Sequence, residues 1–400
     1  MSDTHDADMK RWGFATKAIH GPGGPDPRTG AVSQPIYQTS TFAFKNAEAG
    51  AGIFAGEEDG YVYTRISNPT VNALEQTMAL LEGGEVGVAF ASGMAATSAV
   101  IFALCSAGQN IVLCEPVYGG THSLAESVLP RFGIESRLID ALDLDLVRDS
   151  IDENTALVWI ETPANPTLKV VDIAAIGQIA AEKNVPMAVD NTFATPLYQR
   201  PLDLGATIVI HSCTKYISGH GDVVAGMVVT DRATGDRIRR ESLREMGGCL
   251  SPFDAFLLIR GLKTLPIRML HHSENAALIA EHLSTHPKVE RVDYPGRTDH
   301  PQHEIAARQM SGFGGMVTFY IKGGRADGAR FLNNLRLCTL AVSLGDADTL
   351  IEHPASMTHS TYAVDELMQF GITDNLIRIS VGLETMDDIM EDLDQAFSVI

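Results

Sequence analysis

The chain is poor in basic residues and has no long apolar run. Of its 400 residues, 30 are Lys or Arg and 50 are Asp or Glu, which gives a formal net charge of −20 at pH 7. That acidic balance repels nucleic acid and anionic lipid surfaces, so we expect neither as a partner. No apolar stretch approaches the roughly 20 residues that a membrane-spanning helix requires. The sequence therefore argues against a nucleic-acid-binding protein and against a membrane protein.

Cysteine is also scarce and forms no motif. The cysteines are widely scattered, with no CxxC pair and no zinc-type spacing: Cys105, Cys114, Cys213, Cys249 and Cys338. We therefore expect reduced thiols and no metal site. Residues 1–20 carry acidic side chains and no apolar core, so they resemble neither a secretory signal nor a transit peptide. The expected location is the cytoplasm.

Apolar, β-branched runs recur through residues 67–261. Hydrophobic residues make up 45% of the chain, enough to bury a large core. Between several runs lie stretches with apolar residues at three- and four-residue spacing, which is typical of helices. The alternation predicts an α/β fold with a mainly parallel sheet covered by helices on both faces, whose ligands bind at the carboxyl ends of the strands. The expected strands are 86–91, 110–114, 156–162, 186–191, 206–212 and 223–229.

The pattern divides the chain into three parts. Residues 1–65 lack sustained periodicity but contain aromatic and β-branched residues, which argues against full disorder and favours an arm packed on a neighbouring subunit. Residues 66–262 hold the α/β alternation, and residues 263–400 form a smaller α+β domain. A long helical run over about 252–286 is expected to bridge the two domains.

The stretch 206–226, ATIVIHSCTKYISGHGDVVAG, places a lysine directly after a buried strand. Burial lowers the pKa of an amine because it disfavours the ammonium form, and a neutral lysine is the nucleophile that condenses with an aldehyde. Lys215 is therefore a candidate attachment point for a covalently bound cofactor. The alternative is an ordinary surface lysine just past a strand, since lysine is almost never fully buried unless it is paired.

Hydroxyl groups and glycine gather at the ends of two predicted strands. Ser92 and Gly93 open a helix, where free backbone N–H groups and the helix dipole favour an anion. Ser212 and Thr214 flank Lys215 and could hold further phosphate oxygens. The alternative is that these groups only cap a helix and satisfy the backbone of a loop.

Asp190 and Tyr118 also follow predicted strands. Asp190 closes the apolar run PMAVDN, where a buried carboxylate needs a cationic or protonated partner such as a pyridinium N–H; the alternative is an Asx turn or a helix cap. Tyr118 either covers a flat aromatic cofactor or is a half-buried loop residue. Together with Lys215 and the turn at Ser92, they supply the acid, aromatic face, amine and anion site that pyridoxal phosphate needs.

A series of segments then carries a resemblance over nearly the full length of the chain. They are YTRISNPT (63–70), ASGMAA (91–96), VYGGT (117–121), ETPANPT (161–167), AVDNTFATP (188–196), HSCTKYISGHGDVVAG (211–226), LIRGLKTLPIRM (258–269), SLGDADTLIEHPASMTH (343–359) and IRISVGLE (377–384). In this order they resemble the Cys/Met-metabolism family of pyridoxal-phosphate enzymes, and most closely its members that cleave methionine. The resemblance implies the aspartate aminotransferase-like fold (fold type I), with a cofactor domain over 66–262 and a substrate-carboxylate domain over 263–400.

The resemblance also implies a role for each matching residue. Lys215 would bond to the aldehyde of the cofactor, and Asp190 would pair with its ring nitrogen. Tyr118 would stack on the ring and act as acid or base at the sulfur of the substrate. The remaining cofactor-binding positions are Ser92, Gly93, Met94, Asn165, Ser212, Thr214 and, reaching from the neighbouring subunit, Tyr63 and Arg65.

Substrate contacts follow in the same way. Arg378, on the apolar run LIRIS, matches the residue that holds the α-carboxylate, and a guanidinium there independently favours a bidentate carboxylate; the alternative is a structural ion pair. Ser343 matches a supporting position near that carboxylate. Tyr63 would serve the substrate as well as the cofactor. The shared residues Tyr63 and Arg65 imply an obligate dimer, and the resemblance implies that two such dimers pair into a homotetramer.

The implied reaction is γ-elimination of L-methionine and homocysteine-like thioethers to methanethiol, 2-oxobutanoate and ammonia. Methionine-cleaving members often carry cysteine where this chain has Gly120, and Lys-Asp where it has Arg244 and Glu245; glycine makes the site roomier and resembles the cystathionine enzymes. Those enzymes tend to place glutamate where this chain has Val342, and an apolar residue there suits a methylthio group. The alternatives are an O-acylhomoserine sulfhydrylase, a cystathionine γ-lyase or γ-synthase and, from another class, a non-catalytic scaffold.

Overall fold

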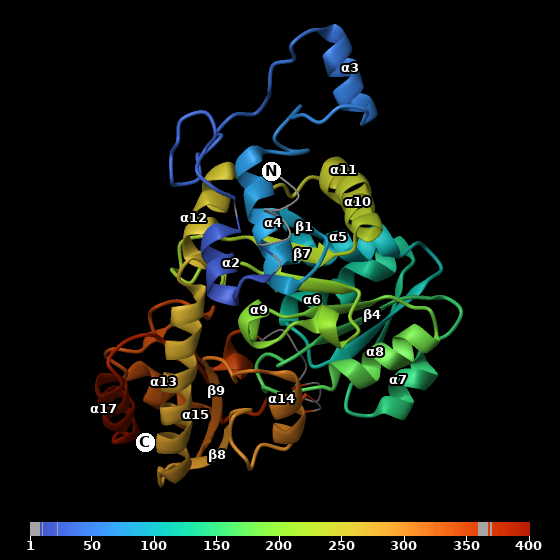
Figure 1. Cartoon of the computed structure of the whole chain (residues 1–400). Helices are drawn as coiled ribbons and strands as arrows, with labels where there is room; N and C mark the ends of the chain where they lie inside the picture. Colours follow the sequence, from blue (N-terminus) through green and yellow to red (C-terminus); the bar gives the residue numbers. More distant parts are fainter. Residues whose placement is uncertain (1–8, 10, 22, 359–366, 369) are drawn as a thin grey trace.

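The computed structural model describes residues 9, 11–21, 23–358, 367–368 and 370–400. Within them the chain forms two sheets, connected through a long helix that runs beside the smaller sheet (Figure 1). The larger sheet lies within residues 86–230 and the smaller one within residues 289–380. Of the segments that carry the family resemblance, SLGDADTLIEHPASMTH extends by its last residue outside the described residues.

The larger sheet is mainly parallel, as predicted. Strands β2 to β6 run parallel in the order β6-β5-β4-β2-β3, and β7 is antiparallel to both β6 and β1 at the other edge. Each expected run forms a strand, but the sequence pattern missed β3, a partly exposed edge strand with the mixed sequence ESRLID. The strands are β1 (Val86–Phe90), β2 (Asn110–Glu115), β3 (Glu135–Asp140), β4 (Thr155–Glu161), β5 (Met187–Asp190), β6 (Ile208–Ser212) and β7 (Gly226–Thr230).

Helices cover both faces of this sheet. One face carries α4 (Pro69–Glu82), α7 (Leu144–Ser150), α8 (Ile173–Glu182) and α12 (Pro252–Leu262), and the other carries α5 (Gly93–Leu104) and α10 (Arg232–Ile238). In β4, Leu157 and Trp159 pack on the α5 side, whereas Val158 and Ile160 pack on the α8 side. Burial of both faces explains why these strands are continuously apolar. Short helices in the connections are α6 (Gly119–Ser123), α9 (Thr195–Tyr198) and α11 (Arg244–Met246).

Local sequence signals set the start of the helices at the upper edge of the sheet. Asn68 caps α4 by accepting a hydrogen bond from the Thr70 N–H, and Pro69 occupies the first turn, where a missing N–H breaks no helical bond. Ser92 caps α5 by accepting a hydrogen bond from the Ala95 N–H at 3.0 Å. The cap fixes the first turn of α5 directly after the carboxyl end of β1.

The smaller sheet follows α13 (Leu265–Thr285) and has the order β10-β11-β12-β9-β8. The single helical run expected over 252–286 is broken between α12 and α13, because Pro266 in the first turn of α13 has no N–H to continue the ladder. The pattern also missed β10 and β11, which are too short to show a period. The strands and remaining helices are β8 (Val289–Asp293), β9 (Met316–Ile321), β10 (Thr339–Leu340), β11 (Leu350–Glu352), β12 (Leu376–Ser380), α14 (His303–Gln309), α15 (Arg325–Asn333) and α17 (Met386–Phe397).

The chain before α4 forms an extended arm. It carries α2 (Phe14–His20) and α3 (Ala47–Ala55), neither of which the sequence pattern predicted, and α3 lies beyond the main body at the top of Figure 1. Apolar side chains of the arm are exposed, with Val32 at 83% and Phe54 at 65%. Residues 1–8 of the predicted arm lie outside the described residues.

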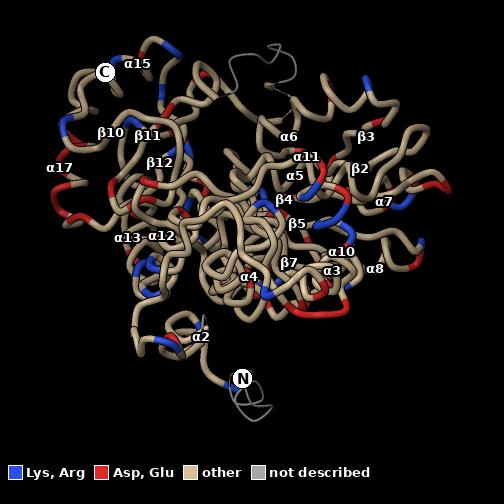
Figure 2. Tube along the Cα trace, turned by 90° about the horizontal axis from the view of Figure 1, so that it is seen from above, with Lys and Arg blue, Asp and Glu red and all other residues tan. Residues whose placement is uncertain are grey.

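Lys, Arg, Asp and Glu residues gather on the outer segments, and both signs of charge occur along α7 and α15 (Figure 2). In the described part of the chain, no helix combines the length and the apolar character that crossing a membrane would require. The five cysteines are free thiols, and all except Cys249 are buried.

Candidate active site

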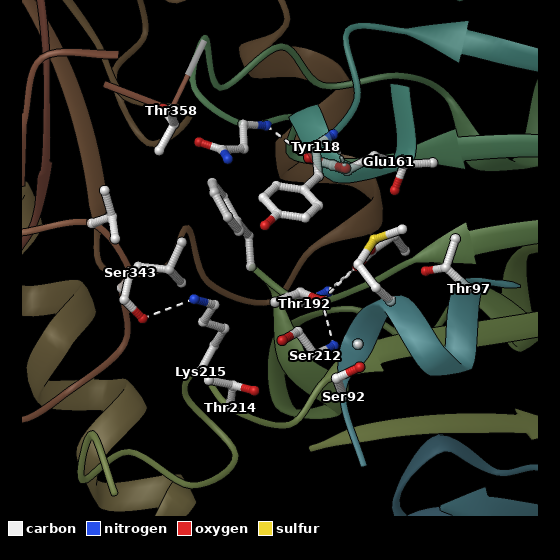
Figure 3. A pocket seen from close by; sticks show the side chains of 18 of the residues that line it. Ser92, Thr97, Tyr118, Glu161, Thr192, Ser212, Thr214, Lys215, Ser343 and Thr358 are labelled. Carbon is white, nitrogen blue, oxygen red and sulfur yellow. Dashed lines mark hydrogen bonds between the residues drawn. The ribbon is translucent and has the colours of Figure 1, made fainter. Parts of the chain in front are cut away.

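A cavity of about 310 Å³ opens where the parallel strands of the larger sheet end, opposite a segment that precedes β11 (Figure 3). It lies at the edge of the sheet where ligands were expected. Tyr63, Arg65 and Gly120 are the predicted site residues that do not line it. The predicted residues that do line it are Ser92, Gly93, Met94, Tyr118, Asn165, Asp190, Ser212, Thr214, Lys215, Val342, Ser343 and Arg378.

Lys215 extends into the cavity from the turn after β6. Its Nζ donates a hydrogen bond to Ser343 Oγ at 2.8 Å (Figure 3). Burial, and then the nearby Arg378 guanidinium, lower the pKa of Lys215 to about 8, although the Asp346 and Glu352 carboxylates oppose the shift. An amine with that pKa is readily available in its neutral form, so it can act as a nucleophile or a base. The alternative of an ordinary surface lysine is therefore wrong.

Arg378 is a second cation of the cavity and is only 3% exposed. Its Nη1 donates a hydrogen bond to Asn165 Oδ1 at 2.8 Å, and its Nη2 donates one to the Ser343 carbonyl at 2.7 Å. Nη1 also forms an ion pair with Glu352 Oε1 at 2.9 Å. Its buried Nε has no partner among the described residues. The register of β11 and β12 places Glu352 opposite Arg378, so the structural ion pair exists. The free N–H still gives the guanidinium capacity for a ligand carboxylate.

Ser343 joins these two cations. Its hydroxyl accepts the hydrogen bond from Lys215, while its carbonyl accepts one from Arg378. The backbone φ of Ser343 is 92°, a conformation that costs a residue with a Cβ on the order of 1–3 kcal/mol. The strained backbone aims both oxygens of Ser343 at groups that line the cavity.

Two carboxylates, the buried Glu161 and the half-buried Asp190, end neighbouring strands on the opposite wall. The register of β4 and β5 places Glu161 directly beside Asp190. Asp190 Oδ1 accepts hydrogen bonds from the Thr192 N–H at 3.0 Å and the Thr192 hydroxyl at 2.5 Å, so the Asx-turn alternative is also correct. Burial raises the pKa of Asp190, and burial and the neighbouring Asp190 raise the pKa of Glu161 well above its usual range. A protonated ring nitrogen beside Asp190 would compensate this negative charge.

The start of α5 borders the cavity with its first turn. Gly93 contributes no side chain, and a Cβ there would lie 2.9 Å from the Cβ of Ser212, closer than such atoms approach. Gly93 therefore packs directly against Ser212, and both residues line the cavity near the free backbone N–H groups of the first turn of α5. Thr214 Oγ1 accepts a hydrogen bond from the Ala225 N–H at 3.0 Å, so part of its hydroxyl capacity serves the loop, as the alternative held.

Tyr118 stands near the centre of the close-up (Figure 3) and is 46% exposed. Gly120 packs closely against the Tyr118 ring and Met94. A Cβ on Gly120 would lie 2.5 Å from Cε1 of Tyr118 and 3.0 Å from Sδ of Met94. That this glycine makes more room for the substrate stays a prediction. Gly120 gives the Tyr118 ring its place, and a larger residue there would displace the ring or Met94.

Tyr63 and Arg65 lie on the arm, away from the cavity of their own chain. Tyr63 is 43% exposed, and the Arg65 guanidinium lies 5.7 Å from the centre of its ring. Arg65 also donates a hydrogen bond to the Arg244 carbonyl, and Arg244 forms an ion pair with Glu245. Arg244 is thus part of the contact between the arm and the main body through its backbone carbonyl.

Sequence reasoning missed several polar residues of the site. Glu161 and Thr192 line the cavity, and Glu352 pairs with Arg378 behind it. The position of Glu161 at the end of an apolar strand, like that of Asp190, was a usable signal. Glu352 had none, because only the register of two short antiparallel strands brings it to Arg378.

The residues present fit pyridoxal phosphate. Lys215 offers an amine with a lowered pKa, Asp190 a half-buried carboxylate for a ring N–H, Tyr118 an aromatic face, and the turn at Gly93 an open backbone for a phosphate. In the described part of the chain, no cluster of His, Cys, Asp and Glu is arranged to hold a metal ion. Fold and cavity together define the class of pyridoxal-phosphate enzymes built on a large, mainly parallel sheet.

Comparison with known proteins identifies the family within this class. The model of the Cys/Met metabolism PLP-dependent enzymes matches residues 15–398. The chain therefore belongs to this family of enzymes, uses pyridoxal phosphate as its cofactor and acts on a small amino-acid substrate.

Several individual proteins are similar over almost their whole length. An L-methionine gamma-lyase of Fusobacterium nucleatum subsp. polymorphum is 51% identical, over 98% of this chain and 100% of its own. A cystathionine beta-lyase of Coxiella burnetii is 46% identical, over 95% of this chain and 97% of its own. The crystal structure of metB from Corynebacterium glutamicum, 42% identical, superposes with a TM-score of 0.93, over 98% of this chain and 99% of that one.

Attachment of the cofactor should follow the lowered pKa of Lys215. Only the neutral amine condenses with an aldehyde, so the rate at which apoprotein binds pyridoxal phosphate covalently should rise with pH and level off above about 8. A lysine with the ordinary pKa of 10.5 would keep gaining rate well beyond that pH. Visible absorbance, with borohydride trapping at timed points, measures this rate. A continued rise to pH 10 would contradict the lowered pKa.

Proposed function

We propose that the enzyme catalyses γ-elimination of L-methionine and of homocysteine-like thioethers. One methionine and one water would give methanethiol, 2-oxobutanoate and ammonia. Similarity to L-methionine gamma-lyases over nearly the full chain supports this substrate class. The observation in the structure that carries it is Val342, an apolar residue that lines the cavity, precedes Ser343 in the chain and is 56% exposed.

The residues of the cavity divide the chemical work. When bound, pyridoxal phosphate supplies an aldehyde for the substrate amine and a conjugated ring that accepts electrons from Cα. Arg378 holds the α-carboxylate, and the Nζ of Lys215 removes a proton from Cα and later one from Cβ. Tyr118 gives its hydroxyl proton to sulfur as the Cγ–S bond breaks and the bonding electrons leave with sulfur. Asp190 holds the proton of the ring nitrogen.

The lining of the cavity favours a methylthio end group over an amino acid end group. Val342, Val224, Phe193 and Leu344 contribute apolar side chains to the wall. A distal ammonium of cystathionine would need a free carboxylate, and Glu161 already accepts two hydrogen bonds from backbone N–H groups. Leaving an ammonium unpaired in such surroundings costs more than is gained by binding it.

Two reactions on the same residues remain as second candidates. The identity to a cystathionine gamma-synthase of Mycobacterium bovis is 46%, close to that of the lyases, so cleavage or synthesis of cystathionine is one of them. The other is replacement at Cγ of an O-acylhomoserine by sulfide. Both would use Lys215, Asp190 and Arg378 in the same roles and would differ in the group that leaves or enters.

A substrate comparison tests the proposal. Purified holoenzyme is given L-methionine, L-cystathionine, or O-acetylhomoserine with sulfide, and kcat/KM is measured for each. We expect methionine to rank first, because the apolar wall penalises the amino acid end of cystathionine by at least about tenfold. Rapid product from O-acetylhomoserine and sulfide, with none from methionine alone, would replace the proposal by the sulfhydrylase.

We also propose the assembly that the arm suggests. The exposed apolar residues of the arm and the position of Tyr63 and Arg65 outside their own cavity favour active sites shared between two subunits, in a homotetramer. With the arm over residues 1–65, we keep the division into a cofactor domain over 66–262 and a substrate-carboxylate domain over 263–400. Location in the cytoplasm stays a prediction from the sequence.

A further inference from the structure

Glu161 is a buried carboxylate that has no role in the proposed reaction mechanism. It is 6% exposed and lines the cavity at the carboxyl end of β4. Its two oxygens accept hydrogen bonds from two different segments: Oε2 from the Tyr118 N–H at 2.7 Å, and Oε1 from the Asn165 N–H at 2.9 Å. The side chain thus fastens the loop after β2 to the loop after β4.

Stability alone does not account for a carboxylate at this position. The charges that act most on Glu161 are those of two other carboxylates, Asp190 and Glu115. Among the described residues no cation forms an ion pair with Glu161, so burial of this acid is costly. What the position uses is a pair of acceptor oxygens, and an amide of the same shape would offer only one.

The contacts of Glu161 continue to the substrate side of the cavity. Asn165 Oδ1 accepts a hydrogen bond from Arg378 Nη1 at 2.8 Å. One unbroken series therefore runs from the backbone of Tyr118 through Glu161 and Asn165 to the Arg378 guanidinium. The proton donor for sulfur and the group that holds the α-carboxylate stand at its two ends.

We propose that Glu161 is a positioning residue that fixes Tyr118 relative to Arg378, so that the hydroxyl meets the sulfur of a substrate whose carboxylate is already bound. This inference rests on the proposed function, since it assigns Tyr118 the protonation of the leaving group. A misplacement of about 1 Å in such a group costs up to about 10²-fold in rate. Loss of one of the two hydrogen bonds should therefore slow cleavage of the C–S bond, which lowers kcat, more than it weakens substrate binding.

The test compares Glu161→Gln on two nearly isosteric substrates, L-methionine and L-selenomethionine. Methaneselenol is a stronger acid than methanethiol, so its departure depends less on a proton donor. We expect kcat to fall about tenfold or more with methionine and less than about threefold with selenomethionine, while KM changes little. Equal losses with the two substrates would overturn the inference.

Asp392 offers a matched control. It is also a buried carboxylate that binds backbone N–H groups, those of Arg336, Leu337 and Cys338, but it lies in the smaller domain away from the cavity. Asp392→Asn removes acceptor capacity for backbone N–H groups, as Glu161→Gln does, and should leave the ratio of the two kcat values unchanged. A changed ratio in both variants would mean that lost stability, not the position of Tyr118, explains the effect.

Failure of the proposed function is recognised separately, because wild-type enzyme would then release no 2-oxobutanoate from methionine. In that case L-cystathionine and its selenium analogue replace the two substrates. Glu161→Gln must again slow the sulfur substrate more than the selenium one, and Asp392→Asn must slow both alike. Equal losses in the Glu161 variant overturn the inference there too.

Discussion

Replacing Lys215 with alanine should abolish multiple turnover and prevent covalent attachment of the cofactor. The variant loses the amine that bonds to the aldehyde and the base that moves the Cα and Cβ protons. Because a positioned base alone contributes about 10²–10⁴-fold, the combined loss in kcat should exceed about 10⁴-fold. The checks are 2-oxobutanoate release under saturating methionine and the visible absorbance that borohydride removes from wild-type holoenzyme.

Folding should not confound this result. Since burial lowers the pKa of Lys215 from 10.5 to about 8, the buried ammonium costs the apoprotein on the order of 3 kcal/mol at pH 7. This cost is fully present below pH 8 and disappears as pH rises from 8 to 10.5, so Lys215→Ala apoprotein should be no less stable at pH 7. Lys263→Ala, at an exposed lysine after α12, is the control that keeps both activity and absorbance. Substantial turnover by Lys215→Ala would contradict the assignment of Lys215 as the amine that binds the cofactor and as the base.

Replacing Arg378 with lysine should lower kcat/KM for methionine by about 10²–10³-fold, mostly through KM. Lysine keeps a positive charge for Glu352 but lacks the planar fork that binds a carboxylate with two parallel hydrogen bonds. Truncating one partner of a buried charged hydrogen bond costs roughly 2–5 kcal/mol, which brackets the expected effect. Steady-state kinetics over a wide range of methionine concentration measure the split between kcat and KM.

An analogue without the α-carboxylate separates this role from a structural one. We expect 3-(methylthio)propylamine to bind wild-type enzyme weakly, and to bind Arg378→Lys no more weakly than wild type, because its missing carboxylate never used the guanidinium. The inhibition constant against methionine measures this. An analogue that loses affinity as much as methionine does would show that Arg378 acts on the fold of the site instead.

The main strands of the larger sheet could be predicted because a strand that is buried on both faces appears in the sequence as a continuous apolar run. Strands such as β4 and β6 contain continuous apolar runs, ALVWI and IVI, which are visible in the sequence. The edge strand β3 and the short strands β10 and β11 carry no such record, since half-exposed or brief strands show little periodicity. The break between α12 and α13 was readable from Pro266 and was overlooked.

The residues of the candidate site that could be predicted are those whose position in the sequence gives a local signal. Lys215, Asp190 and Tyr118 each follow an apolar strand, and parallel strands bring their carboxyl ends to one edge. Glu352 and the strained Ser343 could not be found in this way, because their placement depends on register and on a backbone conformation that no local pattern encodes. The close approach of Gly120 to Tyr118 and Met94, two residues that line the cavity, could not be predicted either, because it depends on how the loop after β2 folds.

Product analysis with L-methionine as the only substrate tests the central claim most directly. Purified holoenzyme, with pyridoxal phosphate and no added thiol, should release methanethiol and 2-oxobutanoate in equal amounts over many turnovers. Lys215, Tyr118 and Arg378 are then sufficient, with the cofactor, to break the Cγ–S bond without a second substrate. Absence of 2-oxobutanoate under these conditions, or its appearance only when a second nucleophile is supplied, would contradict the account.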